Sequence, residues 1–392
     1  MLPPSLDILY QILYSMIIVE SFIPVWDRLD KLSFQMKNLH RIAIIPGDGI
    51  GNEVISEGVK CLKTLSEILE NVQFEFQYFP WSSEYYLQHG KMMPEDGLEI
   101  LKGFDAIYLG AVGDPRIPDD VTLHGLLLPI KMGFDLYVGL RPVYLFPGIE
   151  SPLTNISGGE IDIVVIRENT EGEYSNVGGI VGIEDREMAI QSGLFTRKGM
   201  ERIITFAFEY AREKGRKKVT SVTKSNAQRY GMVLWDRVFK EVASQFPEIR
   251  TESKLIDAAC MDVVRNPKGY DVIVGSNLFA DILSDLTAGV TGGLGLAPGA
   301  SFNPKDKKYP GFFDPVHGSA PDITGKGLAN PIAAILTAKL MLDYLGEREA
   351  ADLLYRAVGQ NLSEKKVRTV DLGGRSKTDE VGDDIVRILR SL

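Results

Sequence analysis

The sequence predicts an α/β protein with a central, largely parallel sheet, and three observations support this. Short apolar segments alternate with segments whose apolar residues recur at helical spacing. Most of the apolar segments end in polar or glycine-rich residues, as strands do at the ligand-binding edge of a parallel sheet. The length of 392 residues exceeds the roughly 100–200 residues of a typical domain, so two lobes are expected.

The predicted elements follow one another in a regular order from residue 41. A strand at 41–46 precedes the glycine turn GDGIG and a helix at 52–69, in which Val54, Val59 and Leu62 share one face. Helices are also expected at 198–214, 230–246 and 277–285, and GGIVGIED (178–185) predicts a hairpin that protrudes as an arm. The other predicted strands are 72–79, 104–113, 161–169, 217–226 and 270–277.

Composition excludes several classes of protein. The 43 basic and 53 acidic residues give a net charge of −10, so the chain gains no electrostatic affinity for nucleic acid. A P-loop ATPase is excluded because no GK[ST] follows a glycine-rich loop. Cys61 and Cys260 belong to no CxxC pair, which disfavours a structural zinc site and favours a cytoplasmic protein with free thiols.

The N-terminal segment requires a separate interpretation. Its apolar run, 8–19, is shorter than the about 20 residues of a membrane span, and no basic residue precedes it as in a signal peptide. We therefore expect no membrane association, and we interpret residues 1–37 as an N-terminal extension or the product of a start placed too early.

Acidic residues predict a metal site. Asp281 and Asp285 lie four residues apart on a predicted helix, so they share a face and repel each other unless a cation lies between them. Asp257, in a largely apolar stretch, is a candidate third carboxylate. Mg²⁺ and Mn²⁺ prefer such oxygen ligands. The alternative is a solvated acidic face.

Basic residues near the predicted strand ends complement these acids. Lys131, Arg141 and Arg167 predict a site for a di- or tricarboxylate, because a buried guanidinium requires a partner and fits a carboxylate with two hydrogen bonds. Internal salt bridges are the alternative. Lys224 and Tyr174 are the candidate proton-transfer groups, since a lysine close to a metal loses its proton more readily. A surface lysine is the alternative here.

Two glycine-containing loops are candidate cofactor sites. GDGIG (47–51) could leave backbone N–H groups free for an anion, but it lacks the GxGxxG spacing. The 17-residue loop 315–331 is more specific, because a long loop of this composition usually exists to bind something. In it, Asp322 is placed to accept ribose hydroxyls and repel a 2′-phosphate, which predicts NAD rather than NADP.

Together these segments resemble the isocitrate/isopropylmalate dehydrogenase family of metal-dependent oxidative decarboxylases. The resemblance covers about residue 40 to near the C-terminus. It implies a fold that is not a true Rossmann fold, with a large NAD-binding lobe (38–136 with 292–392) and a small lobe (137–291) that carries the arm and a dimer interface. The segments that carry it are IPGDGIGNEV, GLRPV, IRENTEGEY, SVTKSN, SNLFADILSDL and DPVHGSAPDITGKGLANP.

The resemblance also implies a reaction in a homodimer with shared active sites. Lys224 and Asp257 would reach into the site of the other subunit. The divalent metal, Mg²⁺ or Mn²⁺, would be bound by Asp257, Asp281 and Asp285, and a monovalent cation such as K⁺ is a further candidate. Lys224 would accept the hydroxyl proton, and Tyr174 would protonate the enol after CO₂ leaves. The residues implied to bind NAD are Asn226, His317, Gly318, Ser319, Ala320, Asp322 and Asn330.

The resemblance implies that residues 81–130 determine substrate choice. Within the family this segment is most similar to members that act on D-malate and tartrate, so a small 2-hydroxy diacid is expected. Two departures affect this expectation: Lys131 replaces a common arginine, and His124 stands where close relatives tend to have tryptophan. An alternative is 3-isopropylmalate, whose isopropyl group Leu126–Leu128 could contact. Isocitrate is disfavoured by the absence of a serine at 123–128. A non-catalytic regulatory nucleotide-binding subunit is the alternative from another class.

Overall fold

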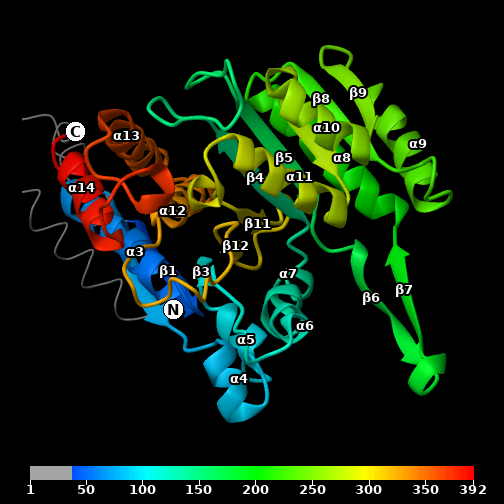
Figure 1. Ribbon diagram of the computed structural model, residues 1–392, viewed down its shortest axis with the longest axis horizontal. Coiled ribbons are helices and arrows are strands. Elements are labelled where there is room, and N and C mark those ends of the chain that lie inside the picture. Colours follow the sequence, from blue (N-terminus) through cyan, green and yellow to red (C-terminus); the bar gives the residue numbers. More distant parts are fainter. Residues whose placement is uncertain (1–37) are drawn as a thin grey trace, which may run out of the picture. The chain divides into compact units, whose positions relative to one another are not determined.

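The computed structural model describes residues 38–392, and residues 39–392 form one compact unit (Figure 1). The proposed N-terminal extension, residues 1–37, lies outside the described residues. Between residues 38 and 392, no helix is long and apolar enough to cross a membrane.

A ten-stranded mixed sheet forms the framework of the unit. Its strand order is β2-β1-β3-β12-β11-β4-β5-β10-β8-β9. The strands from β1 to β12 and from β5 to β9 in this order pair in parallel, whereas β11 is antiparallel to both β12 and β4, and β4 is antiparallel to β5. This confirms the predicted α/β class with a largely parallel sheet. The strands are β1 (Asn38–Gly47), β2 (Val72–Tyr78), β3 (Ala106–Ala111), β4 (Val138–Tyr144), β5 (Asp162–Glu168), β8 (Lys218–Thr223), β9 (Arg250–Leu255), β10 (Val272–Gly275), β11 (Ala300–Phe302) and β12 (Gly311–Phe313).

Helices alternate with most of these strands along the chain, as the sequence pattern predicted. The helix predicted at 52–69 is α3, and Val54, Val59 and Leu62 are buried on one face of it. The longer helices are α3 (Gly51–Ile68), α8 (Arg197–Glu213), α9 (Gly231–Ala243), α10 (Ile256–Arg265), α11 (Asn277–Val290), α12 (Ile332–Leu345), α13 (Arg348–Glu364) and α14 (Thr378–Leu389). The shorter ones are α4 (Ser83–His89), α5 (Gly97–Leu101), α6 (Asp119–Thr122) and α7 (Leu128–Gly133).

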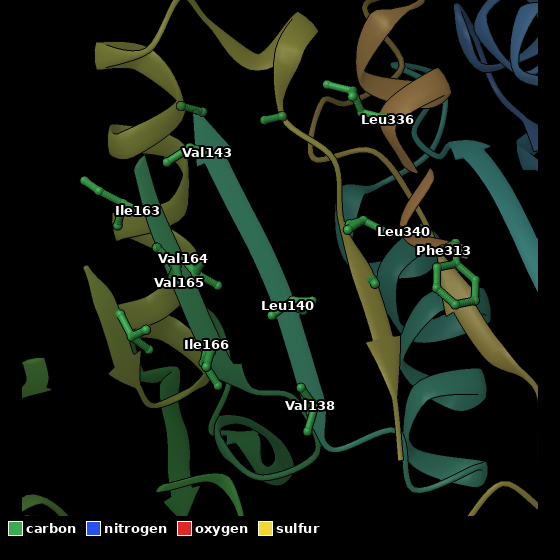
Figure 2. Packing of buried hydrophobic residues seen from close by; sticks show 14 of the residues in the cluster. Val138, Leu140, Val143, Ile163, Val164, Val165, Ile166, Phe313, Leu336 and Leu340 are labelled. Atoms are coloured by element: carbon green, nitrogen blue, oxygen red, sulfur yellow. The ribbon is translucent and has the colours of Figure 1, made fainter. Parts of the chain in front are cut away.

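The core is continuous across the middle of the sheet. Helix α12 is apolar on nearly all sides and almost fully buried, and it ends at Gly346, whose φ of 90° few other residues adopt. Figure 2 shows side chains of β4, β5 and α12 in this core, among them Val138, Val164 and Leu340. A rigid core beneath the central strands holds their polar side chains in fixed positions.

Alternation along the central strands separates two faces. In β4 and β5, Arg141 and Arg167 point toward α11, because both contact Asp281 of that helix. Leu140 and Val164 point to the opposite face and line a cavity of about 1020 Å³ beside α8. The cavity therefore does not contain the residues predicted to perform chemistry.

The predicted arm is present as a separate two-stranded hairpin. Strands β6 (Gly172–Val181) and β7 (Met188–Leu194) pair antiparallel and extend away from the main sheet (Figure 1). The hairpin is apolar but exposed, with 73% of Ile180 and 63% of Met188 accessible to solvent. Exposed apolar surface of this kind is typical of sites that contact another molecule, and such a contact stays a prediction for this arm.

The sequence pattern did not predict strand β9, helices α10, α12, α13 and α14, or three strands in the middle of the sheet. Residues 138–144, 300–302 and 311–313 form central strands although their sequences do not alternate clearly. In the sheet order, the five strands from 38–136 and 292–392 lie together and are followed by the five from 137–291. The division of the chain into these two lobes stays a prediction.

Candidate active site

Two arginines and one aspartate form the centre of the site. Nη1 of Arg141 donates to Oδ1 of Asp281 at 2.8 Å, and Nη1 of Arg167 donates to the same oxygen. The strand register explains this convergence: Gly139 of β4 lies opposite Arg167 of β5, so Arg141, two residues further on, points to the same face. Nε of Arg167 also donates to Oδ1 of Asn277 at 2.8 Å, which fixes its orientation.

The second predicted carboxylate lies one helical turn away on α11. Oδ1 of Asp285 is 3.8 Å from Nη1 of Arg141, and 58% of its side chain is exposed, compared with 29% for Asp281. Ser284, between them, accepts a hydrogen bond from Arg141 at 2.6 Å. The helical spacing therefore brings both carboxylates to the arginines.

Tyr174 joins the same cluster from the first residues of β6. Its hydroxyl donates to Oδ2 of Asp281 at 2.8 Å, and the guanidinium of Arg167 lies 5.2 Å from its ring centroid. Burial raises the pKa of Tyr174 to about 12, and Asp281 adds to this increase. The phenol is therefore protonated at neutral pH and is available as a proton donor.

The charges of this cluster perturb one another. Burial raises the pKa of Asp281, but Arg167 and Arg141 outweigh burial and hold that pKa below its usual range. Burial raises the pKa of Asp285; Arg141 opposes this change, whereas the charge on Asp281 adds to it. Neighbouring carboxylates whose pKa values are shifted in opposite directions are typical of functional sites.

The third predicted cation approaches from α7. Lys131 is buried, with Nζ 3.2 Å from Oδ2 of Asp314 and 5.0 Å from the ring centroid of Phe312. Burial lowers the pKa of Lys131, Asp314 opposes this, and Arg167 and Arg141 add to the decrease. The two arginines thus lie close enough to Lys131 for their charges to act on it.

Lys224 and Asp257 form a second group, apart from the first. Lys224 follows β8, and its Nζ lies 2.8 Å from Oδ1 of Asp257 in the first turn of α10. The hydrogen bond from Lys224 lowers the pKa of Asp257. Within residues 38–392, no three acidic, histidine or cysteine side chains come together as a metal site. The expectation that Asp257 acts in the site of a second copy stays a prediction.

The two predicted cofactor loops contact each other. The N–H of Ile50 donates to the carbonyl oxygen of Ser319 at 2.9 Å. Gly49 has a φ of +54°, and a Cβ there would come within 2.0 Å of the same oxygen, so only glycine permits this approach. Loop 315–331 has neither helix nor strand, as predicted.

Most N–H groups of the GDGIG turn are already bonded within the protein. The N–H groups of Asp48, Ile50 and Gly51 all donate to carbonyl oxygens of the protein, so they are not free for an anion. The carboxylate of Asp48 is itself buried and accepts from the N–H groups of Ser83 and Gly113, both at 2.8 Å. The turn therefore links neighbouring loops, and among residues 38–392 the N–H of Gly49 has no hydrogen-bond acceptor, so the expected anion contact stays a prediction for this one group.

The predicted cofactor residues of the long loop differ in exposure. Nε2 of His317 is buried without a hydrogen-bond partner, and burial lowers the pKa of this imidazole. Asn330 is buried and donates to Asp371 at 3.0 Å, whereas Asp322 and Gly318 are exposed. Ala320 adopts a φ of 42°, which is uncommon for a residue with a side chain and often marks a functional loop.

The remaining predicted residues lie at the surface. His124 is exposed on a π-helical turn, Leu123–Leu127, a feature that often occurs at functional sites. Asn226 is exposed in the loop after β8. Leu126 and Leu128, by contrast, are buried, so of the leucines 126–128 suggested for an isopropyl pocket only Leu127 is partly accessible.

Sequence reasoning missed three residues of the cluster. Asn277 and Ser284 bind the arginines, and Asp314 pairs with Lys131. Asn277 and Ser284 lie on the helix of the two aspartates, which was an available signal. Asp314 directly precedes loop 315–331, but nothing local indicated that Lys131, 183 residues earlier, would be its partner.

Comparison with known proteins identifies the class to which this fold and site belong. Residues 41–385 match the family model Isocitrate/isopropylmalate dehydrogenase. The chain therefore belongs to this family of oxidative decarboxylating dehydrogenases. A solved isocitrate dehydrogenase from Methylococcus capsulatus superposes with a TM-score of 0.81 at 34% identity, and the match covers 90% of this chain and 99% of that one.

Individual relatives are more similar still. The chain is 49% identical over 352 residues to a probable tartrate dehydrogenase/decarboxylase of Bacillus subtilis, which covers 90% of this chain and 98% of the relative. It is 46% identical over 362 residues to the decarboxylating D-malate dehydrogenase of Escherichia coli, and the match covers 90% of this chain and 99% of the relative. A tartrate dehydrogenase/decarboxylase of Pseudomonas putida is also 46% identical, over 361 residues, covering 90% and 98%.

Proposed function

We propose that this protein catalyses the NAD- and divalent-metal-dependent oxidation and decarboxylation of D-malate, tartrate or both. The observation that carries the proposal is the convergence of Lys131, Arg141 and Arg167 beside Asp281 and Asp285. Three cations offer binding partners for both carboxylates of a small diacid, and the acids provide oxygen ligands for a metal. Relatives at 46–49% identity are named for these two substrates.

The donor set fits a hard divalent cation. Asp281 and Asp285 repel each other one helical turn apart, and a cation between them relieves the repulsion. We assign Asp257 of a second copy as the third ligand. When bound, Mg²⁺ or Mn²⁺ supplies Lewis-acid polarisation of the oxygen at the reacting carbon.

The residues of the chain then have distinct tasks. Arg141 and Arg167 hold the carboxylates of the diacid, and Lys131 adds a third cation. Lys224 of the second copy accepts the proton of the substrate hydroxyl as hydride leaves for NAD. Tyr174, which is protonated well above neutral pH, donates a proton to the carbon that loses CO₂.

Loop 315–331 fits the adenosine end of NAD. The unpartnered Nε2 of His317 is a buried polar atom that lacks a hydrogen bond in the chain alone. Around Gly318, no atom lies within 4 Å of the position of a Cβ, so space is open above the backbone. The exposed carboxylate of Asp322 is a suitable acceptor for ribose hydroxyls. The remaining assigned contacts are Ser319, Ala320 and Asn330, with Asn226 at the nicotinamide end.

A homodimer would cover apolar surface that one chain exposes. On α10 and α11, Met261 is 56% exposed, Val264 41% and Ile282 46%. These helices also carry Asp257 and the pair Asp281 and Asp285. An interface formed by them would bring the three carboxylates of the proposed metal site together from two copies. The free thiols of Cys61 and Cys260 agree with a cytoplasmic location.

The observations favour a small diacid over 3-isopropylmalate. Leu126 lies in the core, so it cannot contact an isopropyl group in this conformation. The exposed His124, on the adjacent π-helical turn, is polar and suits a substrate with a hydroxyl or no branch at C3. A regulatory subunit is disfavoured because the complete acid, lysine and tyrosine set is present.

A panel of substrates tests the proposal. The purified protein is given NAD, Mn²⁺ and each of D-malate, the tartrate stereoisomers, isocitrate and 3-isopropylmalate, with NADH and CO₂ both measured. We expect NADH and CO₂ from D-malate or NADH from a tartrate. Turnover of 3-isopropylmalate, without turnover of D-malate or of any tartrate, would contradict the assigned substrate.

A further inference from the structure

The buried lysine of the site has one close ionic partner among residues 38–392. Only 9% of the Lys131 side chain and 17% of the Asp314 side chain are exposed, and Nζ lies 3.2 Å from Oδ2. Below the ammonium lies the ring of Phe312, with its centroid at 5.0 Å. Burying an ammonium costs free energy unless an opposite charge pairs with it. Loss of the Asp314 carboxylate would therefore destabilise the protonated form of Lys131.

The other charges near Lys131 do not replace Asp314. Arg141 of β4 and Arg167 of β5 repel the ammonium, and burial acts in the same direction. Asp281 of α11 attracts it but already accepts hydrogen bonds from both arginines. The carboxylate of Asp314 also acts on His317 in the loop that follows it, where burial lowers the pKa of the imidazole and Asp314 opposes this decrease.

We propose that Asp314 is a positioning residue that keeps Lys131 protonated, so that Lys131 binds a carboxylate of the diacid substrate. The inference rests on the proposed function for the identity of the ligand. Lysine differs from arginine here, because a buried ammonium can lose its proton whereas a guanidinium does not. Asp314 thus sets the pH range over which the chain binds its substrate.

The substitution Asp314→Asn tests this assignment. Without the carboxylate, Lys131 faces burial and two arginines, so it deprotonates at lower pH. We expect KM for the diacid to rise about tenfold for each pH unit above the new pKa of Lys131, measured from about pH 6 to pH 9. In the wild type, we expect the corresponding rise in KM to begin at a higher pH than in Asp314→Asn, because Asp314 opposes the decrease in the pKa of Lys131.

The double variant Asp314→Asn, Lys131→Arg separates charge from structure. Arginine stays protonated without a partner, so the double variant should recover a KM that does not rise with pH. The matched control is Asp343→Asn, which removes the partner of Lys339 in an exposed helical pair of 2.7 Å and should leave the pH profile unchanged. A pH-dependent KM in the double variant would overturn the assigned role.

A spectroscopic readout tests Asp314 independently of turnover. With ¹³C-labelled lysine, the ε-carbon signal of Lys131 is assigned by its loss in Lys131→Arg. We expect this signal to titrate at lower pH in Asp314→Asn than in the wild type. Equal titration in both proteins overturns the inference, whereas absence of turnover by the wild type with every diacid contradicts the proposed function instead.

Discussion

Lys224 and Asp257 form an ion pair of 2.8 Å on the side of α10, and neither has a hydrogen bond or ion pair with Asp281 within the described part of the chain. The chain therefore holds a candidate base and one candidate metal ligand apart from the arginine cluster. Under the proposed function, a second copy would supply both groups at once, and this would account for their pairing.

Metal removal is expected to abolish turnover. Chelation leaves Asp281 and Asp285 to repel each other, and the substrate loses a binding partner. We expect no NADH formation after treatment with EDTA and recovery with Mn²⁺ or Mg²⁺. Metal at about one hundred times its Kd should also stabilise the fold by about 2.7 kcal/mol, measured as an increase in Tm. Full turnover without divalent ions would contradict the metal assignment.

Tyr174→Phe removes the proposed proton donor but keeps the ring. We expect kcat to fall by about 10²–10⁴, the usual contribution of general acid catalysis. Because the pKa of Tyr174 is about 12, ionisation of this phenol should not reduce wild-type activity at pH values below about 11. Tyr78→Phe, at an exposed position on β2, is the matched control and should retain wild-type kcat. A Tyr174→Phe protein as active as the control would rule out this role.

Glu168 should make the fold less stable as pH rises. It is 4% exposed, and burial raises its pKa to about 7, although the N–H of Glu171 and the hydroxyl of Thr170 oppose the change. The folded state thus binds this proton more tightly than the unfolded state, so its stabilisation is present below about pH 4.5 and is lost by pH 7. The loss is about 3 kcal/mol.

Denaturant unfolding at pH 5 and pH 8 measures this effect. The free energy of unfolding should fall between these values in the wild type, and Glu168→Gln should reduce the fall because glutamine does not titrate. Glu99→Gln, in an exposed helical pair, provides the control. If the free energy of unfolding falls between pH 5 and pH 8 as much in Glu168→Gln as in the wild type, the Glu168 carboxyl is not the source of this pH dependence.

Asp322→Ala should relax the preference for NAD. The exposed carboxylate repels a 2′-phosphate, and removing a repulsion of about 1 kcal/mol changes the ratio of kcat/KM values about fivefold. We expect NADP use to increase relative to NAD by at least this factor, measured with both cofactors at saturating diacid. Asp306→Ala, on another loop, should keep the wild-type ratio. An unchanged ratio of NAD to NADP use in Asp322→Ala would contradict the assignment of Asp322 to the ribose site.

The sequence predicts the regular parts of this fold well because periodicity reports burial. The helix that contains Val54 and Leu62 and the strand that contains Arg167 lie where apolar spacing indicated. Strand β4 was not predicted because its side chains Arg141 and Pro142 face a site and a cavity rather than a uniform core. The arm was predicted from its glycines, but its exposed apolar surface appears only in the structure.

The candidate site was predicted in its residue types but not in all its pairings. Spacing along α11 correctly brought Asp281 and Asp285 to one face. The pairing of Lys131 with Asp314 depends on how β12 and α7 meet in space, which local sequence does not report. The sequence also did not show that the N–H groups of Asp48 and Ile50 in the GDGIG turn donate to Ala111 and Ser319, which lie far away in the sequence.

Mixing two inactive variants tests the shared site most directly. Lys224→Ala and Asp281→Asn proteins are each unfolded, mixed and refolded together, and NADH formation from the preferred diacid is measured. If each site takes Lys224 from one copy and Asp281 from the other, the mixed dimers contain one complete site, and activity should return to about a quarter of wild type. Activity no greater than that of either variant alone would contradict the account.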